Sequence, residues 1–293
     1  MTLQFEYIPT NGIQLHTALA GPENGPPVIL LHGFPEAWFG WENQIHPLAK
    51  AGFRVIAPDQ RGYNLSDKPE GVDAYQIELL VNDILGLANS LGLKQFHLAG
   101  HDWGAIVAWN VALSMPERVK HLIIANVPHP AVFRDYLRTH PAQMIKSWYA
   151  GFFQVPRLPE LSSRAGNWRF LIRAMPEYWA ENQRNRYRKA WSQPGAITAM
   201  INWYRAAFSL TRTNPASQVV RPPTLIIWGK QDPHLSHQMA PLSLAYCQAG
   251  QLVMIENATH WVQHDQPERV NQLMLEHLIK RDEQGGLPFQ YPV

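Results

Sequence analysis

Cysteine and charge are both scarce in this sequence of 293 residues. Cys247 is the single cysteine, which excludes an internal disulfide and a zinc site built on cysteine pairs, and we expect it to be buried and inert. Charged residues make up only 16% of the chain, and 25 Lys and Arg against 23 Asp and Glu leave a net charge of +2. A balance this close to neutral disfavours a nucleic-acid-binding protein.

The sequence also has no long hydrophobic run, and its first residues lack the pattern of a secretory leader. The longest apolar runs, such as 28–31, have the length of a strand and fall far short of the roughly 20 residues that cross a membrane. The opening MTLQFEYIPTNG has no basic segment followed by an apolar one, so we expect no signal peptide. The sequence therefore predicts a cytoplasmic protein without a transmembrane segment.

Short apolar runs alternate with helical patterns over much of the chain. The Asn11-Gly12 turn signal predicts a β-hairpin within the first 20 residues. Continuous apolar runs that alternate with helices are typical of parallel strands buried on both faces. The predicted strands are 28–31, 54–57, 96–99, 121–125, 224–228 and 251–255, the predicted helices include 75–91, 105–114 and 268–280, and the tail 281–293 is expected to be irregular.

The alternation stops in the middle of the chain. Residues 130–217 contain no convincing strand, are rich in Trp, Tyr and Arg, and are expected to be mostly helical. We therefore predict a core domain of residues 1–129 and 218–293 with a helical cap of residues 130–217 inserted into it. The cap contains 13 Lys and Arg against 4 Asp and Glu, so it is basic while the core is acidic. Its charge predicts either a solvated helix face or a weak attraction to an anionic surface.

The strongest local motif is GHDWG, which places Asp102 between a predicted strand and a predicted helix. This context is typical of a nucleophile elbow, a sharp turn that lifts a reactive side chain to the top of a sheet. An aspartate in place of the usual serine disfavours a serine esterase. The simpler alternative is an aspartate that caps the helix.

A second motif, HGFP, follows the strand 28–31 and lies where a loop can direct a backbone N–H at the nucleophile. The N–H groups of Phe34 and Trp103 would then form an oxyanion hole. His32 and His101 lie inside the two motifs, and we expect them to support the site structurally.

Asp232 and His260 follow two consecutive predicted strands in the second half of the chain. An acid that orients a histidine, and a histidine that activates water, are the partners that a covalent nucleophile requires. The chain order of nucleophile, acid and base is the usual one for this kind of site. Taken singly, Asp232 could cap a turn at Pro233 and His260 could be a core histidine.

The motifs HGFPE, GHDWGA, NWYR and HWVQ resemble those of epoxide hydrolases of the α/β-hydrolase fold. The resemblance covers nearly the whole chain apart from the last ten or so residues, and it is weaker in the insertion. It implies a mostly parallel central sheet flanked by helices, an inserted helical cap and a cis peptide bond between Phe34 and Pro35. It also implies no metal, no organic cofactor and a role in detoxification.

The resemblance further implies a role for each site residue. Asp102 would attack an epoxide carbon to form a hydroxyalkyl ester, and water activated by His260 and Asp232 would release a vicinal diol. Tyr149 and Tyr204 match the cap tyrosines that hold and protonate the epoxide oxygen. Tyr178 and Tyr187 lie in the same insertion and are the competing candidates.

The aromatic insertion favours a small hydrophobic epoxide as substrate. The sequence specifies neither the epoxide nor the oligomeric state, and a homo-oligomer stays open. The residues that we expect to line the pocket are Phe34, Trp103, Ile106, Phe152 and Trp261.

The sequence leaves two other functions open. A dehalogenase would use the same Asp102 nucleophile, with a halide held by Trp103 and either Trp148 or Trp203. Haloalkane dehalogenases typically carry Asn where this chain has Phe34, and fluoroacetate dehalogenases carry Arg where it has Trp103. The other alternative is a non-catalytic ligand-binding protein on a hydrolase scaffold.

Overall fold

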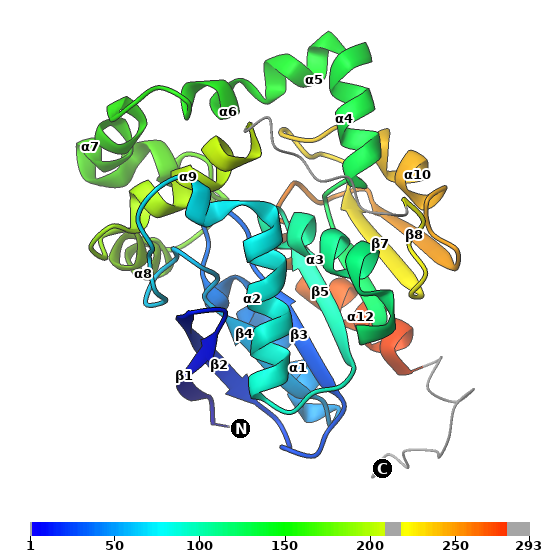
Figure 1. Cartoon of the computed structure of the whole chain (residues 1–293). Coiled ribbons are helices and arrows are strands. Elements are labelled where there is room, and N and C mark those ends of the chain that lie inside the picture. Colours follow the sequence, from blue (N-terminus) through cyan, green and yellow to red (C-terminus); the bar gives the residue numbers. More distant parts are fainter. Residues whose placement is uncertain (1, 209–217, 280–293) are drawn as a thin grey trace.

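An eight-stranded sheet runs through the protein in a computed structural model, which describes residues 2–208 and 218–279 (Figure 1). The strand order is β1-β2-β4-β3-β5-β6-β7-β8. Strands β1 (Gln4–Thr10) and β2 (Ile13–Ala20) form the predicted antiparallel hairpin. Both turn residues, Asn11 and Gly12, have the positive φ angles that such a turn requires.

The other six strands are parallel to one another and confirm the predicted sheet. Apart from β8 at the edge of the sheet, whose residues are exposed or half-buried, their side chains are largely buried because helices cover both faces, which explains the continuous apolar runs in the sequence. These strands are β3 (Pro27–Leu31), β4 (Arg54–Pro58), β5 (Phe96–His101), β6 (Val119–Ala125), β7 (Thr224–Gly229) and β8 (Gly250–Ile255).

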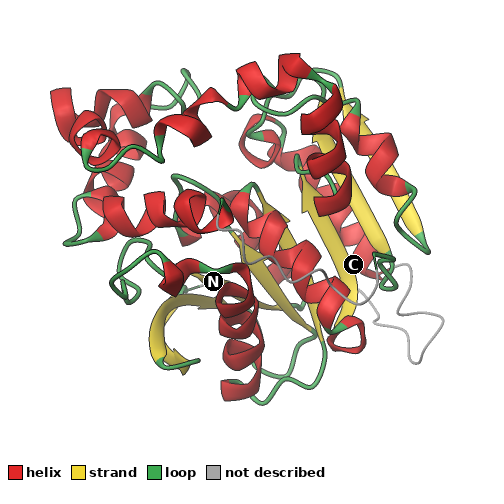
Figure 2. Cartoon of the chain, turned by 45° about the horizontal axis from the view of Figure 1, so that its top comes forward, coloured by secondary structure: helices red, strands yellow, loops and turns green. Residues whose placement is uncertain are grey.

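Helices flank the sheet on both faces (Figures 1 and 2). On one face α2 (Ile77–Ser90) packs against α3 (Trp103–Ser114), and on the other α1 (Glu42–Lys50) packs against α12 (Pro267–Ile279). Three of these helices confirm the predicted helical patterns. The shorter helices are η1 (Trp38–Trp41), η2 (Asp73–Tyr75), η3 (Pro116–Arg118), α10 (Met239–Leu244) and α11 (Val262–Asp265).

Among the described residues, six helices lie between β6 and β7, and we call them the cap helices. They lie beyond the carboxyl ends of the parallel strands, at the top and left of Figure 1. Residues 130–208 contain no strand, as expected. The division into domains stays a prediction, and residues 209–217 and the tail lie outside the described ranges. The cap helices are α4 (Pro130–Thr139), α5 (Pro141–Lys146), α6 (Trp148–Phe152), α7 (Leu158–Ile172, interrupted at 165–168), α8 (Glu181–Trp191) and α9 (Ala196–Ala207).

Two further predictions concern Cys247 and the membrane. The expectation that Cys247 is buried is met only in part. The residue is half-buried, because it lies in a short segment after α10 at the edge of the sheet. Burial raises the pKa of its thiol to about 11, so the thiol stays protonated at neutral pH. Across residues 2–208 and 218–279, no helix has both the length and the apolar character needed to span a bilayer.

Candidate active site

Asp102 lies in the sharp turn between β5 and α3. Its backbone has φ +49° and ψ −125°, a strained conformation for a residue with a side chain. Close packing holds this turn in place: a Cβ at Gly104 would lie 2.1 Å from the Leu31 carbonyl oxygen, and a Cβ at Gly33 would lie 2.3 Å from the Asp102 Cβ. The glycines around the motif therefore let the backbone approach the Asp102 side chain closely.

The Asp102 carboxylate has two polar neighbours from other loops. Its Oδ1 accepts a hydrogen bond of 2.7 Å from the Phe34 N–H, and its Oδ2 lies 3.4 Å from His260 Nε2. The Phe34-Pro35 bond is cis, as the family resemblance implied. The HGFP loop therefore directs a backbone donor at the carboxylate, and its part in an oxyanion hole stays a prediction.

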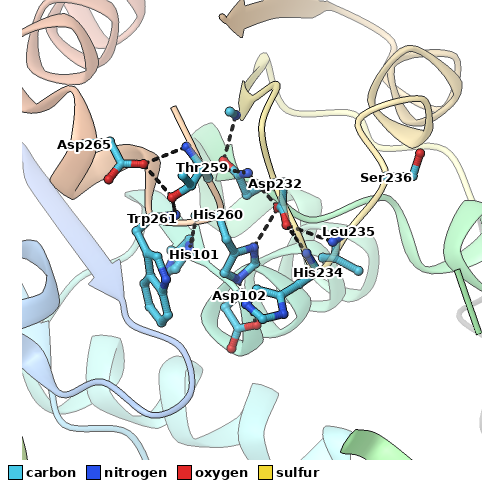
Figure 3. Close-up of polar contacts among 12 residues, drawn as sticks. His101, Asp102, Asp232, His234, Leu235, Ser236, Thr259, His260, Trp261 and Asp265 are labelled. Atoms are coloured by element: carbon cyan, nitrogen blue, oxygen red, sulfur yellow. Dashed lines mark hydrogen bonds and ion pairs between the residues drawn. The ribbon is translucent and has the colours of Figure 1, made fainter. Parts of the chain in front are cut away.

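Asp232 and His260 complete the cluster of polar side chains around Asp102 (Figure 3). His260 Nδ1 donates to Asp232 Oδ2 over 2.7 Å. The same Oδ2 accepts from Asn126 Nδ2 at 2.8 Å, while Oδ1 accepts from the N–H groups of His234 and Leu235 at 2.7 and 2.8 Å. Four donors thus satisfy a buried carboxylate, which fixes the orientation of the imidazole.

The charges of these three groups depend on one another. Burial acts against every charge, yet the neighbouring carboxylates of Asp232 and Asp102 raise the pKa of His260 to about 10. Burial also works against the two carboxylates, but His260 lowers the pKa of both Asp102 and Asp232 below the usual value. At neutral pH the resting site therefore contains two carboxylates on either side of an imidazolium.

Polar contacts fix the loop that carries His260. Thr259 donates from its N–H and from its hydroxyl to Asp265 Oδ2, both over 2.6 Å. His101 Nε2 donates to the His260 carbonyl oxygen over 2.8 Å, which places a proton on that nitrogen (Figure 3). Glu36, the buried last residue of the HGFPE motif, lies 3.1 Å from His101 Nδ1.

The cap helices bring two tyrosines to the same cavity as Asp102. Tyr149 comes from α6 and Tyr204 from α9, and their ring centroids lie 5.9 Å apart. Burial and then the charge of Asp102 raise the pKa of both phenols. Both hydroxyls therefore stay protonated at neutral pH and can donate to an oxygen atom opposite the carboxylate.

The two competing tyrosines have other partners. Tyr178 donates to Asp265 Oδ1 over 2.8 Å, and Tyr187 donates to Glu36 Oε1 over 3.2 Å. Neither tyrosine lines the cavity. The structure therefore brings Tyr149 and Tyr204 to Asp102, and it places Tyr178 and Tyr187 elsewhere.

The cavity has a volume of about 500 Å³, and its walls agree only in part with the predicted pocket. Phe34 and Trp261 line it, while Trp103, Ile106 and Phe152 do not. Trp103 packs instead against Tyr204, with 5.0 Å between ring centroids, and Ile106 lies further along α3. Tyr149 of α6 and Phe153, which directly follows α6, line the cavity, whereas Phe152 packs with its ring centroid 6.0 Å from those of Phe153 and Phe170.

Three polar residues that line the cavity were not among those predicted from the sequence. His234 lies two residues after Asp232, and its place after a strand end could have marked it; burial lowers its pKa to about 4, so the ring is neutral. Lys146 and Arg173 reach the cavity from α5 and from the end of α7, and no motif marks either of them. Within the described ranges, no three His, Cys, Asp or Glu side chains gather as they would around a metal ion.

Comparison with known proteins agrees with this geometry. Residues 26–267 match the α/β hydrolase fold family, so the chain belongs to this family of hydrolases. It is 46% identical to the AB hydrolase superfamily protein YfhM of Bacillus subtilis over 93% of this chain and 97% of that protein. It is 36% identical to Epoxide hydrolase 4 of Mus musculus, over 91% of this chain and 77% of that protein.

Solved structures narrow the class further. A variant of an epoxide hydrolase from Bacillus megaterium superposes with a TM-score of 0.87 at 32% identity, over 93% of this chain and 99% of that one. An epoxide hydrolase from hot-environment metagenomes gives 0.86 at 34% identity, over 95% and 99% of the two chains. Within the α/β hydrolases, the chain is therefore a member of the epoxide hydrolase family.

Proposed function

We propose that this protein hydrolyses a small hydrophobic epoxide to a vicinal diol through an ester on Asp102. The observation that carries the proposal is the cavity itself, in which an ionised carboxylate shares the walls with two protonated phenols. A nucleophile on one side and proton donors on the other are what the opening of an epoxide ring requires. The names of the related enzymes agree with this chemistry.

In the first step Tyr149 and Tyr204 hold the epoxide oxygen by hydrogen bonds. An Asp102 carboxylate oxygen attacks a ring carbon, the carbon–oxygen bond on the opposite side breaks, and the released oxygen takes a proton from a phenol. The charge of Asp102 is a cause of the high phenol pKa values, and this charge disappears as the ester forms. The phenols therefore become stronger acids at the moment when the leaving oxygen needs a proton.

The same loss of charge prepares His260 for the second step. The resting imidazolium cannot accept a proton, but the ester removes one of the two carboxylates that raise the pKa of His260. We propose that the imidazolium proton passes to the phenolate left by the first step. The number of protons then balances, and His260 becomes a neutral base that is still hydrogen-bonded to Asp232.

In the second step His260 takes a proton from water, and the hydroxide attacks the ester carbonyl carbon of Asp102. The Phe34 N–H already contacts the carboxylate at 2.7 Å, and with the Trp103 N–H it would stabilise the tetrahedral oxyanion. Removal of one such donor typically costs roughly 3–4 kcal/mol of barrier. The diol leaves with one oxygen that came from Asp102. No step requires a metal or an organic cofactor.

A single-turnover reaction in heavy-oxygen water tests this proposal. Excess enzyme is mixed with styrene oxide, and the diol is examined by mass spectrometry. The ester route predicts a first-turnover diol with two unlabelled oxygens, one from the epoxide and one from Asp102. A diol that carries a heavy oxygen in the first turnover would mean direct attack by water. An Asp102→Asn control should form no diol.

Halogenated substrates in the same assay test the dehalogenase alternative. The Trp203 indole N–H, one candidate for a halide site, already donates to the Arg61 carbonyl oxygen over 3.0 Å, and Trp148 is 59% exposed. We therefore expect no halide release.

The proposal includes a cytoplasmic location and no nucleic-acid partner. The lone cysteine favours the location, and the small net charge favours the absence of a nucleic-acid partner.

A further inference from the structure

Gln143 of α5 is a buried polar residue of the cap that binds the core. The residue is only 2% exposed, and its Nε2 donates to the His234 carbonyl oxygen over 2.7 Å. Its Oε1 accepts a hydrogen bond of 2.9 Å from the Ser236 N–H. The side-chain amide thus binds two backbone groups of the segment that follows β7, one as a donor and one as an acceptor. Such a pair of hydrogen bonds fixes the direction in which two elements approach each other.

The segment that Gln143 binds also contains Asp232 (Figure 3). The Asp232 Oδ1 accepts hydrogen bonds from the N–H groups of His234 and Leu235, while its Oδ2 binds His260. The segment is therefore held by a carboxylate of the core on one side and by an amide of the cap on the other. This places the attachment of the cap at the loop that orients the proposed general base.

On the cap side, Gln143 is connected to the beginning of α6, the helix that carries Tyr149. Gln143 Nε2 donates to the Ser147 hydroxyl oxygen over 3.1 Å, and the Gln143 carbonyl oxygen accepts from the Ser147 N–H over 2.9 Å. Ser147 directly precedes α6, and Tyr149 is the second residue of that helix. One side chain therefore links the loop of Asp232 with the helix that presents a cavity phenol.

The ring of His234 lies between the two halves of the site. Its centroid is 5.9 Å from that of Tyr149 and 5.3 Å from that of His260, and both contacts are edge-to-face. Gln143 thus fixes the backbone of a residue whose side chain packs against both the phenol and the imidazole. The same amide controls the position of this spacer and the position of α6.

We infer that Gln143 is a positioning residue, which holds the Tyr149 hydroxyl in line with Asp102 for the opening of the ring. The inference rests on the proposed function and adds to it a residue that does not line the cavity. The hydrogen bonds of the Gln143 side chain lead to the start of α6 and to the core loop. Tyr204 comes from another helix, α9, so the two phenols should respond differently to the loss of this amide.

The expected effect of Gln143→Met follows from the displacement of a reacting group. Methionine keeps the length of the side chain but leaves the His234 carbonyl oxygen and the Ser236 N–H without their partner. A misplacement of about 1 Å can cost up to about 10²-fold in rate. We expect ring opening at saturating epoxide to slow about tenfold, because the phenol is displaced and not removed. Rapid-mixing kinetics of adduct formation measures this step.

A double-mutant cycle distinguishes positioning from a general structural role. If Gln143 acts through the Tyr149 hydroxyl, Gln143→Met/Tyr149→Phe should open the ring no more slowly than Tyr149→Phe. Gln143→Met/Tyr204→Phe should be about tenfold slower than Tyr204→Phe, because Tyr149 is then the remaining donor. An unchanged rate in Gln143→Met, a further loss in the first pair or no further loss in the second would each overturn the inference.

The conservative variant Gln143→Glu restores the arrangement in one protonation state. A protonated carboxyl group can donate to the His234 carbonyl oxygen and accept from the Ser236 N–H, whereas a carboxylate cannot donate. Relative to the wild type, ring opening should be nearly normal at about pH 5 and should fall as the pH rises and the carboxyl group ionises. A ratio to the wild type that stays constant up to about pH 8 would overturn the inference. This profile decides the question even if Gln143→Met fails to fold.

Gln193→Met is the matched control. Gln193 of the cap donates to the Lys189 carbonyl oxygen over 3.3 Å and so binds its own segment and not the core. This variant should open the ring at the wild-type rate, and an equal loss in it would overturn the inference. Slow ring opening in Tyr149→Phe with a normal rate in Gln143→Met would refute the positioning role and leave the proposed function intact. A normal rate in Tyr149→Phe would instead contradict the proposed function itself.

Discussion

The core and the cap hold their halves of the site in different ways. In the core, four donors hold the Asp232 carboxylate, and a strained turn packed against glycines holds Asp102. In the cap, aromatic packing holds the Tyr204 ring, with centroids 5.1 Å from Phe34 and 4.8 Å from Phe153. Hydrogen bonds fix direction, whereas aromatic packing fixes position more loosely. The core therefore suits chemistry that needs exact alignment, and the cap suits the accommodation of different substrates.

The largest effect is expected when His260, the proposed general base in the core half of the site, is replaced. In His260→Gln the glutamine can still bind Asp232 but cannot accept a proton from water. Asp102 should react once and stay esterified, so that the protein mass rises by the mass of one epoxide. Steady-state diol formation should fall by on the order of 10³- to 10⁴-fold. Mass spectrometry after brief mixing checks the adduct.

The exposed His46 of α1 provides the control, because His46→Gln should turn over normally. If His260→Gln forms diol at the wild-type rate and no adduct appears, a different residue activates the water.

A smaller but still large effect is expected when the hydroxyl groups of the two cap tyrosines are removed. Tyr149→Phe and Tyr204→Phe each keep the ring and its packing and remove one donor to the epoxide oxygen. Each single variant should lose about 10²-fold in ring opening, and the double variant should lose nearly all of it. Rapid-mixing kinetics of adduct formation measures this step directly.

Tyr178→Phe and Tyr187→Phe are the informative comparisons, since both hydroxyls bind elsewhere. A loss in either that exceeds the loss in Tyr149→Phe would mean that the wrong phenols have been assigned. Tyr7→Phe, on the exposed face of β1, should behave as the wild type.

The smallest expected effect concerns alkaline stability. The neighbouring carboxylates raise the pKa of His260 from 6.5 to about 10 against the effect of burial, so the folded state binds a proton that the unfolded state loses. This stabilisation is complete below pH 6.5 and is lost as the pH rises to about 10, on the order of a few kcal/mol in the free energy of unfolding. Burial raises the pKa values of the cap tyrosines above 10, so their effect begins only above that pH.

Urea unfolding between pH 7 and pH 9.5 should therefore isolate the contribution of the core. The free energy of unfolding of the wild type should fall over this range, and that of His260→Gln should fall less. Equal slopes in the two proteins would show that His260 is not protonated in the folded state.

Much of the core could be predicted because its residues follow a simple rule. Buried parallel strands appear as continuous apolar runs, and the segments after their carboxyl ends meet at one edge of the sheet. Asp102, Asp232 and His260 each follow such a run, so the sequence alone grouped them, and the structure places them within hydrogen-bonding or ion-pair distance of one another. Residues 130–208 of the cap contain no strand, and the cap helices give no comparable register.

The sequence by itself determined which segments become strands, where the reactive turn lies and where the helical segment interrupts the sheet. Local spacing and apolar periodicity specify these features. Only the tertiary structure decided that Tyr149 and Tyr204 face Asp102, that Phe153 lines the cavity in place of Phe152, and that Lys146 and Arg173 border it. These outcomes depend on the rotation and packing of the cap helices against the core, and contacts between residues distant in the chain set both.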